Sequence, residues 1–539
     1  MKTQSFFSGT LILLGAGILT KVLGALFIIP LTRLIGAEGV GLLQMASPVF
    51  VAAAVLCASG IPVATSKLVS ERLAVRDESG AIQVVSVSLA AALPVAVLLS
   101  YALYAGAGFI AAFIVRDPRV FFPLRCLSPA VCFITCSAVF RGYFQGRSIM
   151  VPTAVSNVTE QVVRVVVGLG LAYALLPRGV HWSAAGAAMG GSCGAFVGFL
   201  VLIMYFIAVG RENPIPKSGG KSNHVSRTSP GRQSSRCTIK EVVALAWPVT
   251  MASLVWPLQD FLNAAIIPTR LQYIGFSVSH SAELYGRLSG MALGLVALPG
   301  VVTTAMAINL VPQVASAHAK GCRDRTAHLT KSAIRGALLV GIPASAGLLA
   351  LPTQISALVF GDPGAGVPLK IMSFGSTFLC LQQTTASVLN GVGKVDLPLR
   401  NGLIGATCAT LTNYVLTGIP GVDIKGAAFG IGLGFLVTGV LNVIACGKLT
   451  GPGPDLLISG LRAAVASAIM FPVVQGINGF LLMRTLNCTV STSCAILAGV
   501  VVYGLALIFL GELSLREIAV IPVVGNLLAK TFRFTGWAR

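Results

Sequence analysis

The sequence predicts an all-α integral membrane protein with about fourteen transmembrane helices. We expect two six-helix lobes, related as parallel repeats, and two further C-terminal helices. Three observations lead to this prediction. Of the 539 residues, 55% are hydrophobic and only 10% are charged, a balance that a water-soluble protein cannot bury. Apolar segments of about 20 residues, the length that crosses a bilayer, recur along the whole chain. A motif at the end of the first segment returns in the seventh.

The expected transmembrane segments follow one another at short intervals, with one longer gap after the sixth. They are residues 8–31, 43–66, 82–105, 120–141, 152–176, 184–209, 242–267, 285–311, 333–358, 370–391, 398–418, 425–447, 458–482 and 489–511. The third and ninth are long enough to be tilted or to carry a re-entrant piece. The first segment continues past Lys21 without a small-residue cleavage pattern, so we expect a retained helix rather than a secretory signal.

The loops between these segments differ in charge. Most of the loop Lys and Arg residues lie on one side of the predicted membrane, and the minority side carries Arg33, Arg116, Arg119, Arg178, Arg270, Lys370, Lys425 and Arg484. Because cytoplasmic loops are the basic ones, both termini are expected in the cytoplasm of a bacterial cell, with the chain in the plasma membrane. The net charge of +21 is explained by these loops, and we therefore expect no nucleic-acid partner.

Two pairs of motifs reveal a duplication. The first segment ends in Ile-Ile-Pro-Leu-Thr-Arg-Leu (28–34), and the seventh contains Ile-Ile-Pro-Thr-Arg-Leu (266–271). The fourth ends in Arg-Gly-Tyr-Phe-Gln-Gly-Arg (141–147), and the tenth in Asn-Gly-Val-Gly-Lys (390–394). Six segments separate the copies in each pair, so the halves have the same orientation in the membrane.

This pairing divides the chain. We expect a first six-helix lobe over 1–210, a basic cytoplasmic linker over 211–240 and a second lobe over 241–449. Two additional transmembrane helices would follow over 450–511, and a cytoplasmic interfacial tail over 512–539. The linker is rich in Ser, Gly and basic residues, a composition typical of flexible segments.

The sequence offers little for catalysis, metals or cofactors. The cysteines lie mostly inside apolar segments with no C-x-x-C pair, and the histidines form no ligand cluster. We therefore expect no metal, no cofactor and no enzyme activity. A membrane enzyme such as a glycosyltransferase of lipid-linked sugars is the less favoured alternative, because the expected outer loops are short and their acidic residues isolated.

Several strings resemble one known family. They are Lys-Val-Leu-Gly (21–24), Ile-Pro-Leu-Thr-Arg-Leu-Ile-Gly (29–36), Gly-Ile-Pro-Val-Ala (60–64), Ser-Lys-Leu-Val-Ser-Glu (66–71), Arg-Gly-Tyr-Phe-Gln-Gly (141–146) and Glu160-Gln161 with Arg164. Their combination resembles the multidrug, oligosaccharidyl-lipid and polysaccharide exporter superfamily, more narrowly its stage V sporulation protein B group, and covers nearly the whole chain.

The resemblance implies a V-shaped pair of lobes around a central cavity that opens alternately to either side. It implies a lipid-linked sugar as cargo, such as the peptidoglycan precursor lipid II, in cell-wall or spore-cortex synthesis. Membrane lipids and cell-wall synthases are the other partners it suggests. A cation-coupled exporter of small drugs, which shares the architecture, is the alternative.

Charged residues inside the segments are the candidates for the site, because charge in a bilayer is costly. We expect Lys21, Arg33, Arg141, Arg270 and Arg287 to meet an anionic headgroup in the cavity. Structural roles remain open: Lys21 can snorkel, Arg33 and Arg270 can anchor the outer interface, and Arg141 can be a topology signal.

Acidic residues in the segments are candidates for coupling or gating. Asp260 has no basic neighbour in sequence, and we expect it to take a coupling ion or proton, or to pair with Arg287 or Lys21. Glu160 and Arg164 are four residues apart, a spacing at which they can neutralise each other, with gating as the second interpretation.

Overall fold

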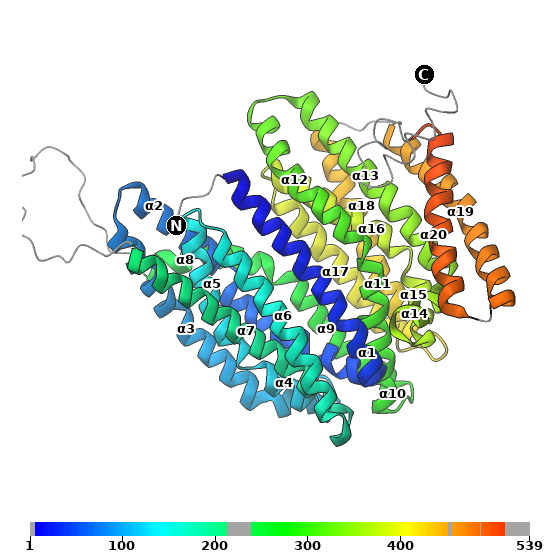
Figure 1. Cartoon of the computed structure of the whole chain (residues 1–539), viewed down its shortest axis with the longest axis horizontal. Helices are drawn as coiled ribbons and strands as arrows, with labels where there is room; N and C mark the ends of the chain where they lie inside the picture. The colour runs from blue at the N-terminus through cyan, green and yellow to red at the C-terminus, as the bar shows by residue number, and fades with distance from the viewer. Residues whose placement is uncertain (1–5, 213–238, 451–454, 486, 513–539) are drawn as a thin grey trace, which may run out of the picture. The chain divides into compact units, whose positions relative to one another are not determined.

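The structure is a computed structural model, and it describes all residues except 1–5, 213–238, 451–454, 486 and 513–539 (Figure 1). Within these ranges the secondary structure is helical, with no strand. The chain separates into two compact units, Met1–Gly286 and Arg287–Arg539. Most of the expected linker and nearly all of the expected C-terminal tail lie outside the described residues.

The first unit begins with one very long helix. Helix α1 extends over Phe6–Ala58, but Gly36 interrupts its helical geometry with φ of 69° and ψ of 179°. A positive φ of this kind is easily adopted only by glycine. The break separates the first two expected transmembrane segments. The remaining helices of this unit are α2 (Ile61–Ala74), α3 (Glu78–Phe109), α4 (Phe121–Leu127), α5 (Ala130–Gly146), α6 (Val151–Leu175), α7 (Val180–Glu212), α8 (Ile239–Ser253), α9 (Val255–Tyr273) and α10 (Val278–Tyr285).

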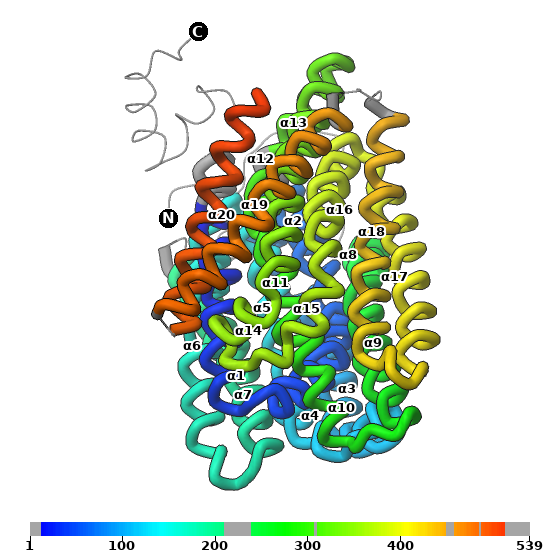
Figure 2. Tube along the Cα trace, turned by 90° about the vertical axis from the view of Figure 1, so that its right-hand side faces the viewer, coloured from blue at the N-terminus to red at the C-terminus, as the bar shows by residue number. Residues whose placement is uncertain are grey.

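The second unit carries the rest of the chain. Its helices are α11 (Leu293–Ala297), α12 (Pro299–Ala319), α13 (Arg323–Ala350), α14 (Pro352–Phe360), α15 (Gly366–Met372), α16 (Gly375–Gly391), α17 (Asp396–Leu416), α18 (Asp423–Thr450), α19 (Asp455–Thr485) and α20 (Cys488–Phe509). In Figure 2, α17 lies beside α18 and α19 beside α20, and the two helices of each pair are packed against each other. Short π and 3-10 segments join several helices.

The all-α membrane fold is confirmed, whereas the count of fourteen spans is not. Ten described helices are long and apolar enough to cross a membrane, or up to 12 if each bent pair counts as one span. Two expected segments fall in the single 60-residue run Gly15–Ala74, and α17 is not among the ten. Since α8 to α10 belong to the first compact unit, the lobe boundaries near 211 and 241 stay a prediction.

Small residues allow helices of the first unit to pack closely. A Cβ atom at Gly41 of α1 would overlap the carbonyl oxygen of Ala282 in α10, and one at Gly286 would overlap that of Ala37. Along α7, Gly190 and Gly194 likewise lie against the backbone of α6. Apolar surface gives little drive to helix association in lipid, so such close backbone contact is what holds membrane helices together.

A buried carboxylate ties three helices of the second unit at one end. The Glu512 side chain, just after α20, is 2% exposed, and its Oε1 accepts a hydrogen bond from Arg335 Nε of α13 at 2.7 Å. Its Oε2 accepts one from Arg462 Nη1 of α19 at 3.1 Å. Burial raises the pKa of Glu512, but hydrogen bonds from Ser459, Arg335 and Arg462 outweigh it and hold the pKa below its ordinary value.

We expect Glu512→Gln to destabilise the protein at neutral pH by about 1.5–3 kcal/mol, because charged hydrogen bonds are lost from a buried group. A depressed carboxyl pKa gives stability that is present above the unfolded-state pKa and lost as pH falls through the folded one. The difference between native protein and variant should therefore shrink below about pH 4. Thermal unfolding in detergent across this pH range measures it.

Glu71→Gln is the matched control, because Glu71 contacts Lys67 at 3.9 Å with both side chains more than half exposed, where an ion pair contributes little. A Glu512→Gln protein as stable as the native one at pH 7 would contradict the prediction.

Candidate functional site

A cluster of three charged side chains lies between α5 and α6. Arg141 Nη2 of α5 donates to Glu160 Oε2 of α6 at 2.9 Å, and Arg164 Nη2, one helical turn further along α6, lies 3.6 Å from Glu160 Oε1. The side chains of Arg141, Glu160 and Arg164 are 21%, 16% and 33% exposed. The cluster carries two positive charges and one negative charge, all within helices long and apolar enough to span a membrane.

The pairing differs in one respect from the expectation. Glu160 and Arg164 do form the predicted pair on one helix face, but the shorter contact of Glu160 is to Arg141, from another helix. Sequence reasoning placed Arg141 at a membrane interface and did not connect it with Glu160. The 19 residues between them include a turn whose geometry the sequence does not specify.

Glycines of α7 fix the backbone under this cluster. A Cβ atom at Gly194 would lie 3.3 Å from Cβ of Arg164, and one at Gly198 would lie 3.1 Å from Cβ of Glu160. Figure 1 shows α6 and α7 running along each other over this stretch. The Glu160 carboxylate lies beside Gly198 and also reaches α5, whereas Nε of Arg164 lies beside Gly191 of α7.

Lys21 of α1 lies on a neighbouring helix. The helices α1 and α6 pack along each other, and a Cβ atom at Gly24 would lie 3.5 Å from Nε2 of Gln161. Lys21 is one helical turn before Gly24 and is exposed. The neighbouring helices α1, α5 and α6 thus carry three basic side chains, Lys21, Arg141 and Arg164, and one acidic side chain, Glu160. We call this part of the three helices the basic wall.

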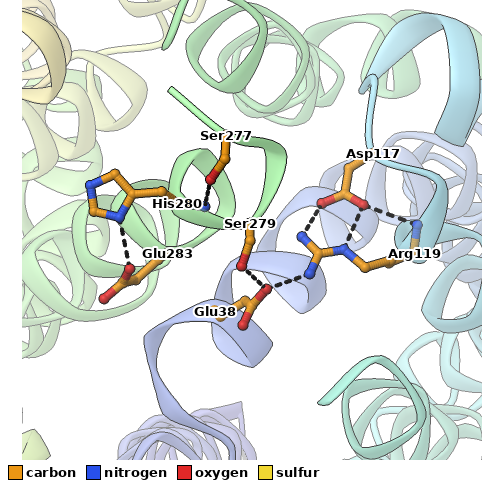
Figure 3. Close-up of polar contacts among 7 residues, drawn as sticks. All are labelled: Glu38, Asp117, Arg119, Ser277, Ser279, His280 and Glu283. Carbon is orange, nitrogen blue, oxygen red and sulfur yellow. Dashed lines mark hydrogen bonds and ion pairs between the residues drawn. The ribbon is translucent and has the colours of Figure 1, made fainter. Parts of the chain in front are cut away.

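A second polar cluster, shown in Figure 3, joins three separate segments of the same unit. Asp117 accepts hydrogen bonds from the backbone and side chain of Arg119, and Arg119 Nη1 reaches Glu38, two residues after the break in α1. Glu38 also accepts a hydrogen bond from Ser279 of α10. In the predicted topology this outer cluster (Glu38, Asp117, Arg119 and Ser279) is extracytoplasmic.

The start of α10 is stabilised locally. Ser277 Oγ accepts a hydrogen bond from the backbone N–H of His280, as an N-cap residue does, and His280 Nδ1 lies 2.9 Å from Glu283 Oε2 (Figure 3). Sequence reasoning did not single out Glu38, Asp117, Arg119 or Ser279 for the site. The available signal was the charge in Asp117-Pro118-Arg119, a short loop between two strongly apolar segments.

The other predicted residues lie elsewhere. Arg33 is an exposed residue of α1, and the guanidinium of Arg270 stacks over the ring of Tyr273, 4.8 Å from its centre. In the second unit, Arg287 Nε donates to Asp362 Oδ2 at 2.8 Å. Of the predicted residues, it is Arg141, Glu160 and Arg164 that meet in one cluster.

Asp260 lies in the bent pair of helices α8 and α9, which meet at 45°. Its neighbours Gln259 and Asn263 are buried, whereas Asp260 is exposed. Among the described residues of its own unit, none forms a hydrogen bond or an ion pair with it. An exposed carboxylate in an apolar helix can take a proton or a cation.

The second unit contains an apolar groove of about 480 Å³. It lies between α13, the junction of α15 with α16, and α19. Its lining includes Ile342, Leu349, Phe374 and Phe471, with Ser345 and Ser467 as polar members. A groove of this character suits an aliphatic chain.

The sequence is similar to that of several known membrane proteins. The sequence profile of the polysaccharide biosynthesis protein family matches residues 6–318. Stage V sporulation protein B of Bacillus subtilis (strain 168) is 28% identical over 530 residues, covering 98% of this chain and 100% of that protein. Lipid II flippase MurJ of the same organism is 24% identical over 505 residues, covering 89% of this chain and 90% of that protein.

Solved structures share the fold. The structure of lipid II flippase MurJ in an inward closed conformation has a TM-score of 0.68 at 16% identity and covers 93% of this chain and 99% of that one. An inward-facing multidrug resistance MATE family transporter has a TM-score of 0.62 at 16% identity, with 82% and 95% covered. The chain belongs to the polysaccharide biosynthesis protein family, as a stage V sporulation protein B-like member of the exporter superfamily that the sequence resembles.

Proposed function

We propose that this transporter is a flippase that moves a lipid-linked oligosaccharide or a peptidoglycan precursor such as lipid II across the plasma membrane. The observation that carries the proposal is that Arg141 and Arg164, in the apolar helices α5 and α6, share the single carboxylate of Glu160, while Lys21 adds a basic side chain on the neighbouring helix α1. Where two arginines share one carboxylate in apolar helices, the positive charge in excess is costly unless an anion or water meets it. The diphosphate of a lipid-linked sugar is an anion of that kind.

The apolar groove of the second unit supports the same cargo. A flippase has to accommodate a long hydrocarbon tail as well as a charged headgroup. We propose that the hydrocarbon tail of the cargo lies in the groove lined by Ile342, Phe374 and Phe471. A flippase of this kind breaks no covalent bond. We propose that it acts in cell-wall or spore-cortex synthesis, with cell-wall synthases as partners and with both termini in the cytoplasm.

Reconstituted flipping tests this function. In liposomes, with and without an ion gradient, the native protein should move a fluorescent undecaprenyl diphosphate-linked sugar between leaflets. Lys21→Ala should slow the movement about tenfold or more, because a charged contact to the headgroup is lost. Lys67→Ala is the control, since Lys67 is an exposed surface residue paired with Glu71. Native protein that flips none of the lipid-linked sugars offered would refute the proposal.

Alternating access requires the outer ends of the helices to separate, and the outer cluster opposes that separation. Glu38→Gln removes the ion pair with Arg119. We expect faster hydrogen exchange in α10, by about tenfold for each 1.4 kcal/mol lost, and no such change in Glu71→Gln. If exchange in α10 is unchanged, Glu38 does not hold this contact closed.

A cation-coupled drug exporter is the second candidate, and Asp260 is the observation that favours it. An exposed carboxylate within a span can carry a proton or a sodium ion. This function predicts ion-driven efflux of a cationic dye from liposomes, lost in Asp260→Asn. The basic wall argues against cationic cargo, because like charges repel strongly where the dielectric constant is low. Dye efflux without any flipping of lipid-linked sugars would favour the exporter.

A further inference from the structure

Glu160 is shared by two arginines. Its Oε2 takes a hydrogen bond from Arg141 at 2.9 Å, and its Oε1 lies 3.6 Å from Arg164. Each carboxylate oxygen thus meets a different guanidinium, and neither arginine has this carboxylate to itself. The carboxylate balances one of the two positive charges, which leaves one in excess at the cluster.

Each of the two guanidinium groups also has one N–H donor without a hydrogen-bond acceptor among the described residues. Nε of Arg141 and Nε of Arg164 are both buried, and neither has an acceptor among the described residues. A buried donor without an acceptor is costly. The side chains of Arg141 and Arg164 are nevertheless 21% and 33% exposed, so a further anion can approach their guanidinium groups.

The backbone around Glu160 has little freedom to respond to such an anion. Gly194 lies against the carbonyl oxygen of Glu160, and Gly198 against its Cβ atom. A shift of α6 toward α7 is therefore blocked by backbone contact. We therefore expect a change at the cluster to take place through rotation of side chains, that of Glu160 among them.

Carboxylate and phosphate bind a guanidinium in the same way, through parallel charged hydrogen bonds. We propose that Glu160 is a built-in competitor of the substrate's diphosphate for Arg141 and Arg164. When the site is empty, Glu160 keeps the two like charges together. When a diphosphate arrives, it displaces the carboxylate, and the returning carboxylate helps to expel the headgroup after transport. This role rests on the proposed flippase function.

The competitor role makes an unusual prediction for Glu160→Gln, which removes the negative charge and keeps the shape. Binding of undecaprenyl diphosphate to the purified full-length protein should become about tenfold tighter or more, the effect of one charge-assisted hydrogen bond. Binding of the uncharged alcohol undecaprenol should not change. The maximal rate of flipping should fall, because release becomes slower.

Inorganic pyrophosphate distinguishes two sources of the anion. If its binding also tightens in Glu160→Gln, the phosphate groups alone are recognised. If only undecaprenyl diphosphate gains affinity, the recognised anion is a lipid headgroup held partly by its tail. Either result supports competition by Glu160.

Control variants separate competition from structure. Arg141→Gln and Arg164→Gln should each weaken binding of the diphosphate lipid. Glu78→Gln should leave it unchanged, because Glu78 pairs with another arginine, Arg147, at 2.6 Å. Should Glu160→Gln fail to fold, Glu160→Asp keeps the charge but withdraws it from the arginines, and a smaller gain in affinity is expected.

Unchanged or weaker diphosphate binding by a folded Glu160→Gln protein overturns the inference. If the native protein nevertheless flips lipid-linked sugars, only the competitor role fails and the flippase function stands. If the native protein neither binds nor flips them, both fail.

Discussion

The constraint on which this structure depends is the cost of a charge inside an apolar helix. A chain with 10% charged residues can place most of them in loops, and the few inside the spans need a neutralising partner, water or a ligand. In the first unit, single carboxylates each contact two partner side chains. Glu160 serves two arginines, and Glu38 serves an arginine and a serine. Glu512 repeats the arrangement in the second unit with Arg335 and Arg462.

These shared carboxylates differ in what surrounds them. Glu512 is 2% exposed, and two arginines from α13 and α19 enclose it, so it fastens the last two helices to the unit. Glu160 is more exposed, at 16%, and its arginines retain unused donors. A carboxylate between two arginines thus holds helices together at Glu512, where it is almost fully buried. At Glu160, where the arginines keep donors without acceptors, it is a candidate binding site.

Much of the fold was predictable because it follows from local patterns. Long apolar segments predict the helices, and the four-residue spacing predicts the contact of Glu160 with Arg164. The duplication inferred from the repeated Ile-Ile-Pro motif stays a prediction. Contacts between helices were not predictable. The partners Glu38 and Arg119 are 81 residues apart in sequence, and Glu38 and Ser279 are 241 apart. Their meeting depends on helix packing and on the break at Gly36, which hydrophobic periodicity does not reveal.

The break at Gly36 allows the N-terminal part of α1 to pivot as a rigid arm. Gly36 is the one non-helical residue within Phe6–Ala58, and Glu38 stands two residues beyond it. Lys21 lies fifteen residues away, about 22 Å along the helix axis at 1.5 Å per residue. A turn of only about 10° at Gly36 would carry Lys21 through an arc of about 4 Å, given that length. A small rearrangement beside Glu38 therefore corresponds to a displacement at Lys21 comparable to the reach of a hydrogen bond, with no helical residue of the arm having to unwind.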